Sequence, residues 1–133
     1  MNTAHKNILI VDDDEDFIQI EKTILESAGY DVTVARNGDE CLEKVGQKKP
    51  DLVILDVLMP RQSGIRLYRE LKTDKSLKNV KVIMLSGVAK RTFMRSQKAL
   101  TEFGGDKVPE PEIYIEKPVE PEDLAAAIEK MLS

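Results

Sequence analysis

The chain has few cysteines, few aromatic residues and no long apolar run. Its single cysteine, Cys41, cannot form a disulfide within the chain and favours a reducing compartment. No stretch approaches the roughly 20 consecutive apolar residues of a transmembrane helix, and residues 1–6 are not followed by a signal-peptide core. These absences predict a cytoplasmic protein with no membrane association.

Positive charge is not in excess either. The chain carries 20 Lys and Arg against 24 Asp and Glu, a formal net charge of -4, and the two signs are well mixed along the sequence. Domains that bind nucleic acid usually show a basic excess, so we expect no nucleic-acid partner. The length of 133 residues with 41% hydrophobic content fits one folded unit, and a single domain is predicted over residues 1–133.

Short apolar runs alternate with segments of helical periodicity. This alternation is typical of repeated strand–helix units and predicts an α/β fold with a five-stranded parallel sheet. A Gly- and Pro-rich stretch, residues 104–112, is expected to form an extended loop before the fifth strand. The expected strands are residues 8–11, 32–35, 52–55, 80–85 and 113–115.

Capping residues mark several helix ends. The first helix is expected to begin after Asp14 and end at Gly29, the second to begin after Asn37 and stop at Gly46, and the last to begin at Pro121. Cys41 is expected to fill the core from the second helix. The inward face of the first helix is predicted to consist of Phe17, Ile20, Ile24, Leu25 and Ala28.

Acidic residues follow two of the expected strands. Asp12 and Asp13 come directly after the first strand, and Asp56 comes directly after the third. Parallel strands end at the same edge of a sheet, so these carboxylates should meet and repel one another, which favours binding of Mg²⁺. Taken alone, the acidic run is equally compatible with turn and capping residues.

A hydroxyl and an ammonium group follow two other strands. Ser86 comes after the fourth strand and Lys117 after the fifth. Each residue alone is more often a cap or a surface residue, but together at one sheet edge they suit the oxygens of a phosphoryl group. Asp56, which stands alone on its strand, is then the candidate nucleophile that forms an aspartyl phosphate.

From Ile8 to the C-terminus, this ordered set resembles the receiver domain of two-component response regulators. The resemblance implies a flavodoxin-like doubly wound sheet of strand order 2-1-3-4-5, in a stand-alone single-domain type. It also implies a Mg²⁺ site in which Leu58 contributes its backbone carbonyl, and a cis bond before Pro118. The matching features are Asp12 and Asp13, Asp56 with Met59, Pro60 and Gly64, Ser86, and Lys117 with Pro118.

The resemblance further implies a phosphorylation-activated switch. A sensor histidine kinase or a histidine phosphotransfer protein would transfer a phosphoryl group to Asp56, Ser86 would move toward it, and Tyr114 would turn inward. Tyr114 has a simpler alternative as a half-buried strand aromatic. The signal would reach a downstream protein through the fourth helix, fifth strand and fifth helix, and a phosphorylation-dependent dimer is compatible with it. The chain is expected to catalyse only its own phosphotransfer and slow autodephosphorylation.

Two departures from the family pattern carry predictions. Leu58 and Val88 are apolar where rapidly dephosphorylating members often carry polar groups that align a water, which predicts a long-lived phosphorylated state. The spacing between Ser86 and Lys117 is longer than usual, and the loop of residues 104–112 either shapes the choice of partner or is a tolerated insertion.

Three other classes of protein share some of these features. A phosphatase of the haloacid dehalogenase type needs a second acid two residues after its nucleophile, where this chain has Leu58. A flavodoxin-like electron carrier needs a phosphate-binding loop after the first strand, where three acids stand instead. A receiver-like interaction module that works without phosphorylation stays open as the alternative function.

Overall fold

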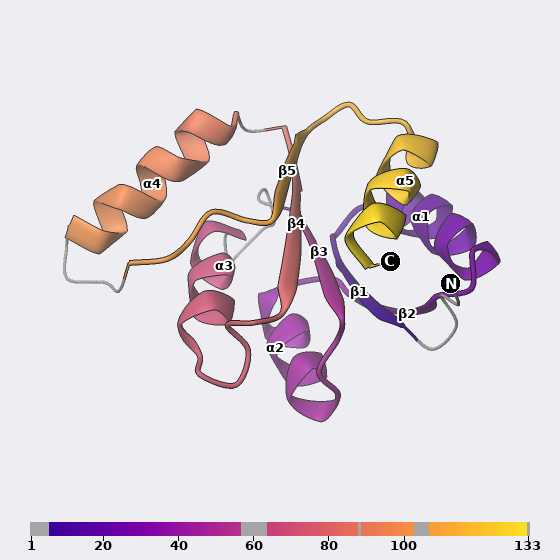
Figure 1. The fold of residues 1–133 in the computed structure, drawn as a ribbon, viewed down its shortest axis with the longest axis horizontal. Helices are drawn as coiled ribbons and strands as arrows, with labels where there is room; N and C mark the ends of the chain where they lie inside the picture. Colours follow the sequence, from indigo (N-terminus) through magenta and orange to yellow (C-terminus); the bar gives the residue numbers. More distant parts are fainter. Residues whose placement is uncertain (1–5, 57–63, 88, 103–106, 133) are drawn as a thin grey trace.

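The strands form one parallel sheet in the order β2-β1-β3-β4-β5, which confirms the predicted fold (Figure 1). The computed structural model describes residues 6–56, 64–87, 89–102 and 107–132. Within these residues four helices connect successive strands and a fifth follows the last strand, and together they cover both faces of the sheet. The elements are β1 Asn7–Val11, α1 Glu15–Ser27, β2 Asp31–Ala35, α2 Gly38–Gln47, β3 Leu52–Asp56, α3 Gly64–Thr73, β4 Lys81–Ser86, α4 Lys90–Glu102, β5 Ile113–Glu116 and α5 Pro121–Leu132.

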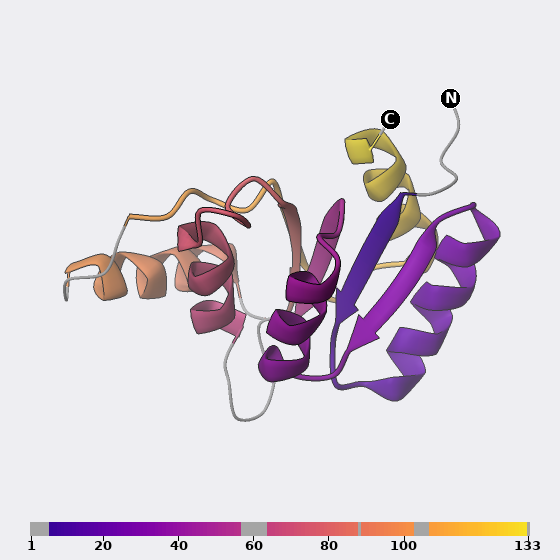
Figure 2. The ribbon, with the colours of Figure 1, turned by 90° about the horizontal axis from the view of Figure 1, so that it is seen from below.

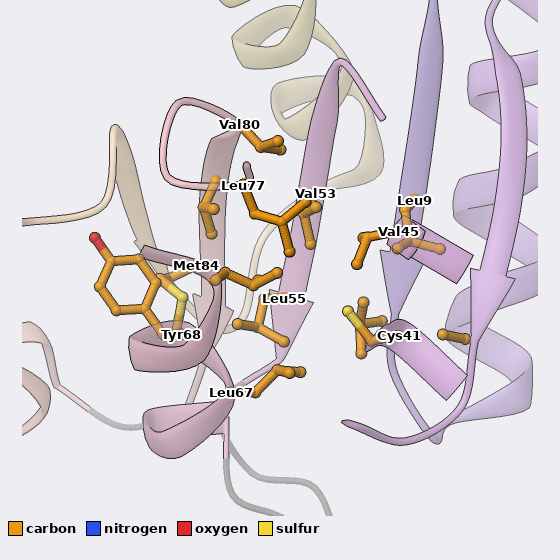
Figure 3. Close-up of a cluster of buried hydrophobic side chains, with 14 of the residues drawn as sticks. Leu9, Cys41, Val45, Val53, Leu55, Leu67, Tyr68, Leu77, Val80 and Met84 are labelled. Carbon is orange, nitrogen blue, oxygen red and sulfur yellow. The ribbon is translucent and has the colours of Figure 1, made fainter. Parts of the chain in front are cut away.

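Two apolar clusters hold the layers together. Helices α1 and α5 cover one face of the sheet, and α2, α3 and α4 cover the other (Figures 1 and 2). The central strands β1, β3 and β4 are buried almost throughout, so both of their faces are apolar, as expected in a doubly wound sheet. Figure 3 shows the face covered by α2, α3 and α4, where Leu67 and Tyr68 of α3 pack toward β3 and β4, and Val45 of α2 lies beside Leu9 of β1.

Helix α1 begins and ends as predicted, but its buried face differs. The Asp14 side chain accepts hydrogen bonds from the backbone N–H groups of Asp16 and Phe17, and Gly29 has a positive φ of 97° just after the helix. The predicted inward face was wrong in part, because Ile20 is 48% exposed and Ala28 is exposed. The residues buried from α1 are Ile18, Glu21 and Leu25.

The prediction that the second helix stops at Gly46 was wrong. The helix runs to Gln47, and the backbone turns extended at Lys48, two residues before Pro50. A glycine inside a helix costs only about 1 kcal/mol, whereas a proline cannot continue the helical hydrogen bonding, so the proline determines the end. Cys41 is fully buried in the core as expected, and burial raises the pKa of its thiol to about 12.

A buried lysine anchors the chain that leads into β5. Lys72 of α3 donates to the Val80 carbonyl at 2.8 Å and to both carboxylate oxygens of Glu112 at 3.3 Å. The same carboxylate accepts from the backbone N–H of Val82 at 2.7 Å. The end of the long α4–β5 connection is therefore fixed against α3 and β4. The part of the predicted loop at residues 104–106 lies outside the described residues.

None of the helices in the described ranges combines the length and apolar composition that a membrane span requires.

Replacing Lys72 by Met is expected to lower the free energy of unfolding by about 2 kcal/mol, because the Val80 carbonyl and the Glu112 carboxylate lose their shared donor. Urea unfolding followed by circular dichroism would measure the change. Lys75→Met, at an exposed lysine just beyond α3, is the control and should stay within about 0.5 kcal/mol of the unmodified protein. Equal losses in the two variants would contradict the anchoring role of Lys72.

Candidate functional site

Three carboxylates meet at the edge where the strands end. Asp12 follows β1 and donates its backbone N–H to the Ala35 carbonyl at 3.1 Å, while Asp56 is the last residue of β3. Carboxylate oxygens of Asp12, Asp13 and Asp56 lie within 4.8 Å of one another. Asp12 and Asp56 are buried, and Asp13 is exposed. The structure thus brings together the three acids that the sequence singled out.

The electrostatic cost of this arrangement is visible at Asp12. Burial, with a further contribution from Asp56, raises the pKa of Asp12 to about 6, although a hydrogen bond from the Asp14 backbone N–H at 3.0 Å opposes the shift. Because the ionised form of Asp12 is disfavoured, a nearby cation would stabilise it. The pocket is therefore poised to bind positive charge.

Lys117 supplies one positive charge to the cluster. Its Nζ lies 3.2 Å from Oδ2 of Asp56 and 5.2 Å from the centroid of the Phe17 ring. Its backbone N–H donates to the Ser86 carbonyl at 2.7 Å, which extends the pairing of β4 and β5 to the site. The peptide bond between Lys117 and Pro118 is cis, as the resemblance implied.

Ser86 and Tyr114 are linked beside the acids. Ser86 is fully buried at the end of β4, and Tyr114 on the neighbouring strand is half-buried. Burial raises the pKa of Tyr114, and a hydrogen bond with the Ser86 side chain opposes this shift. The Tyr114 ring also packs 5.5 Å from that of Phe93 in α4. The two predicted switch residues are thus in direct contact.

The donor set fits a hard divalent cation. Mg²⁺ prefers carboxylate oxygens and keeps several of its waters, so carboxylates whose oxygens lie within 4.8 Å of one another can share one ion, some directly and some through a bound water. Asp12, Asp13 and Asp56 are the residues that would hold it. Leu58, the predicted backbone ligand, lies outside the described residues.

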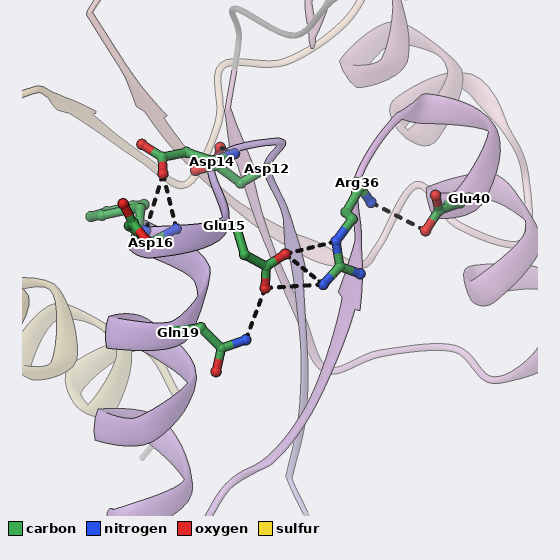
Figure 4. Close-up of polar contacts among 8 residues, drawn as sticks. Asp12, Asp14, Glu15, Asp16, Gln19, Arg36 and Glu40 are labelled. Atoms are coloured by element: carbon green, nitrogen blue, oxygen red, sulfur yellow. Dashed lines mark hydrogen bonds and ion pairs between the residues drawn. The ribbon is translucent and has the colours of Figure 1, made fainter.

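An exposed ion pair supports the first helix next to the pocket. Nε and Nη2 of Arg36 donate to Oε1 of Glu15 at 3.0 and 2.8 Å, and Nη2 also reaches Oε2 (Figure 4). Gln19 donates to Oε2 at 2.9 Å. These hydrogen bonds, with that from Gln19 the strongest influence, lower the pKa of Glu15. Arg36 thus joins the β2–α2 connection to the start of α1.

Glu21 is a buried carboxyl group that the sequence reasoning missed. It is 2% exposed on the inward face of α1, and neither carboxylate oxygen has a hydrogen-bond partner among the described residues. Burial, with contributions from Asp12 and Asp56, raises its pKa to about 8, and Lys117 opposes the shift. The sequence held a signal, because Glu21 lies three residues after Ile18 and four before Leu25 on the same helix face.

Comparison with known proteins identifies the family. The profile of the response regulator receiver domain matches residues 8–129. The chain belongs to this family, which confirms the resemblance seen in the sequence. Receiver domains are signalling switches of two-component systems that take a phosphoryl group from sensor histidine kinases, and they bind Mg²⁺ at an acidic pocket.

Individual relatives support this assignment. The chain is 34% identical over 128 residues to the alkaline phosphatase synthesis regulator PhoP of Bacillus subtilis, covering 96% of this chain and 49% of PhoP. It is 31% identical over 114 residues to the polar-differentiation regulator DivK of Brucella anthropi, covering 86% and 85% of the two chains. This chain thus spans about half the length of PhoP but most of DivK.

Solved structures agree with the fold. A CheY-like receiver domain from Methanospirillum hungatei superposes with a TM-score of 0.80 at 31% identity, covering 97% of this chain and 94% of the other. The chemotaxis protein CheY4 of Vibrio cholerae superposes with a TM-score of 0.80 at 27% identity, covering 97% and 100%. The flavodoxin-like class predicted from the sequence is confirmed.

Glu21 makes stability depend on pH. Its pKa is raised from 4.5 to about 8 on folding, so its carboxyl is harder to ionise in the folded state, and stability is lost as pH rises from about 4.5 to 8. The Gln side chain of Glu21→Gln cannot ionise, so this variant is expected to escape the loss. Its free energy of unfolding, relative to that of the unmodified protein, should therefore rise by roughly 3 kcal/mol between pH 5 and pH 8.

Urea unfolding at several pH values would measure this difference. Glu26→Gln, an exposed glutamate of the same helix, is the matched control and should keep the pH profile of the unmodified protein. A stability difference for Glu21→Gln that stays constant across this range would show that Glu21 ionises normally in the folded protein.

Proposed function

We propose that this chain accepts a phosphoryl group from a sensor histidine kinase or a histidine phosphotransfer protein onto Asp56 in a Mg²⁺-dependent reaction. The observation that carries the proposal is the convergence of three carboxylates within 4.8 Å, with Lys117 Nζ 3.2 Å from Asp56. Family membership and the parallel sheet edge support it. The chain would then act as a switch that catalyses only its own phosphotransfer and slow autodephosphorylation.

The side chains have distinct roles in this proposal. A carboxylate oxygen of Asp56 attacks phosphorus, the P–O bond forms as the P–N bond to the donor histidine breaks, and the imidazole leaves with the bonding electrons. Lys117, already paired with Asp56, stays beside the phosphoryl oxygens and balances their charge. Bound Mg²⁺ would neutralise the remaining negative charge on Asp12, Asp13 and the phosphoryl group.

The output is proposed to leave through α4, β5 and α5. Ser86 would turn its hydroxyl toward the phosphoryl group, and this movement breaks or changes its hydrogen bond with Tyr114. Tyr114 packs against Phe93 of α4, so a change at Ser86 reaches the surface of α4 through two contacts. A downstream protein, or a second phosphorylated copy, would then bind this face.

The region 1–133 is proposed to act as a single receiver unit. The receiver-domain profile spans residues 8–129, which is nearly the whole of this region, and the matched part covers 85% of DivK but only 49% of PhoP. The alternative is a receiver-like interaction module that works without phosphorylation. The complete set of Asp12, Asp13, Asp56, Ser86 and Lys117 favours the phosphorylated switch over this alternative.

Incubation with phosphoramidate and Mg²⁺ is expected to give one phosphoryl adduct by intact mass, because the pocket positions Asp56 beside a cation site and a lysine. Asp56→Asn should give no adduct, and chelation of Mg²⁺ should abolish it. Asp31→Asn, an exposed aspartate at the start of β2, should behave like the unmodified protein. No adduct under any condition would favour the phosphorylation-independent module.

The phosphorylated state is expected to be long-lived, because apolar Leu58 and Val88 cannot align a water for attack on the phosphoryl group. Leu58→Asn should shorten the half-life of the adduct about tenfold, and Leu58→Met should leave it unchanged. The decay of the intact-mass adduct after removal of phosphoramidate measures both. A half-life of the unmodified protein as short as that of a rapidly dephosphorylating chemotaxis receiver would contradict this expectation.

A further inference from the structure

An apolar groove runs between α4 and the segment that returns to β5. It is lined by Met94, Gln97, Lys98 and Thr101 of α4 and by Lys107 and Val108 of the returning segment. Its volume of about 200 Å³ is below the roughly 300–1,000 Å³ of small-molecule sites. The groove therefore suits one or two side chains of a protein segment rather than a separate ligand.

The returning segment is a fixed wall of this groove. Val108 is buried, and the Tyr68 hydroxyl of α3 donates to the carbonyl of Pro109. Further along, Glu110 pairs with Lys90 at the start of α4 at 2.8 Å. Lys107 lines the groove together with Thr101 near the C-terminal end of α4, whereas Glu110 pairs with Lys90 at its N-terminal end. The segment therefore runs antiparallel to α4, as the ribbon in Figure 1 shows.

The opposite side of the groove is fixed as well. Arg69 of α3 donates through Nη1 to the carbonyl and Oε1 of Gln97, at 3.3 and 3.0 Å, and to the Thr101 hydroxyl at 3.3 Å. Gln97 is 3% exposed. These contacts hold α4 on α3, so the groove exists before any partner arrives, which lowers the entropic cost of binding.

Positive charge borders the groove. Three exposed basic residues of α4 recur at helical spacing beside the residues that line the groove, namely Arg91, Arg95 and Lys98. Lys107 adds a positive charge from the opposite wall. Within the described part of α4 the single acidic residue is Glu102. An apolar floor with a basic border is complementary to an acidic segment that carries an apolar anchor.

We propose that this groove binds an acidic segment of a downstream partner protein, whose apolar side chain enters between Met94 and Val108 while its carboxylates contact Lys98 and Lys107. This inference rests on the proposed output face of α4, β5 and α5, and it specifies the location and the chemistry of the partner. The extended α4–β5 segment is thereby a recognition element rather than a neutral insertion.

A continuous set of contacts joins the groove to the phosphorylation site. The Ser86 side chain is hydrogen-bonded to Tyr114, whose ring lies 5.5 Å from that of Phe93. Phe93 meets Tyr68 edge-on at 5.4 Å, and Tyr68 in turn donates to Pro109 in the groove wall. A change at Ser86 therefore acts on the wall through packed rings, and affinity for the acidic segment should change on phosphorylation.

A random 16-residue peptide library displayed on phage would test the proposal. Selection is made on the full chain, once untreated and once with phosphoramidate and Mg²⁺, and the selected peptides are measured by fluorescence anisotropy. The expected peptides are rich in Asp and Glu around one or two large apolar residues. Their affinity should fall about tenfold or more in the double variant Lys98→Glu, Lys107→Glu, and should depend on salt.

The double variant Lys75→Glu, Lys78→Glu carries the same change of charge on exposed lysines away from the groove and should bind the peptides with less than a threefold change. Peptides without acidic bias, equal binding by the two double variants, or no selected peptide at all would overturn the proposal. So would a concentration-dependent dimer that is lost in Lys98→Glu, Lys107→Glu, because a second copy would then occupy the groove. Intact mass measured on the same samples shows whether the chain carries a phosphoryl group. A failure of phosphorylation can therefore be distinguished from a failure of peptide binding at the groove.

Discussion

The mutual repulsion of Asp12, Asp13 and Asp56 is the constraint on which the rest of the structure depends. Two of these carboxylates are buried, and Lys117 offers one ammonium in return. Such an arrangement persists because the paired strands fix its members, with Val11 opposite Leu55, Asp56 opposite Leu85 and Ser86 opposite Glu116. The packed faces of β1, β3 and β4 thus hold in place charges that would separate in a mobile loop.

The carboxylates of the site also affect Glu21, a buried residue of α1. Glu21 lies among apolar side chains, and Asp12 and Asp56 add to the burial that disfavours its ionised form. An uncharged Glu21 lowers the total negative charge near the three carboxylates that could hold a metal ion, whereas an ionised one would add to the repulsion there. Binding of a cation between Asp12 and Asp56 would reduce the field at Glu21. The stability of α1 on the sheet and the charge of the site are therefore linked through this one residue.

The short apolar runs that each end in a polar residue predicted a parallel sheet and the side chains that meet at its edge, whereas the strand order came from the resemblance to receiver domains. Asp12, Asp56, Ser86 and Lys117 are found where parallel strands ending at one edge must place them. Where the sequence failed, tertiary packing decided the outcome. The orientation of α1 buries Glu21 and exposes Ile20, although hydropathy alone favours the reverse.

The long α4–β5 connection shows a second limit of the sequence. Its Gly and Pro content indicated an extended loop but gave no sign that Val108 would be buried, or that Lys72 and Tyr68 would hold the segment against α3. The hydrogen bonds of Lys72 with Glu112 and of Tyr68 with Pro109 join residues 40 and 41 positions apart, so local patterns carry no information about them. The groove beside α4 exists only because of this packing.

The distribution of charge separates the two faces of the molecule that proteins are proposed to use. The edge that carries Asp12, Asp13 and Asp56 repels an acidic segment, whereas Arg91, Arg95 and Lys98 of α4 attract it. A partner of this chemistry is thus repelled by the carboxylates of the proposed phosphorylation pocket and attracted by the basic residues of α4. Discrimination of this kind uses repulsion at the wrong site as well as attraction at the right one. In the proposed phosphotransfer, a donor protein that approaches Asp56 would in turn present complementary positive charge or arrive with the metal in place, so the proposed input and output faces would select different partners on one small domain.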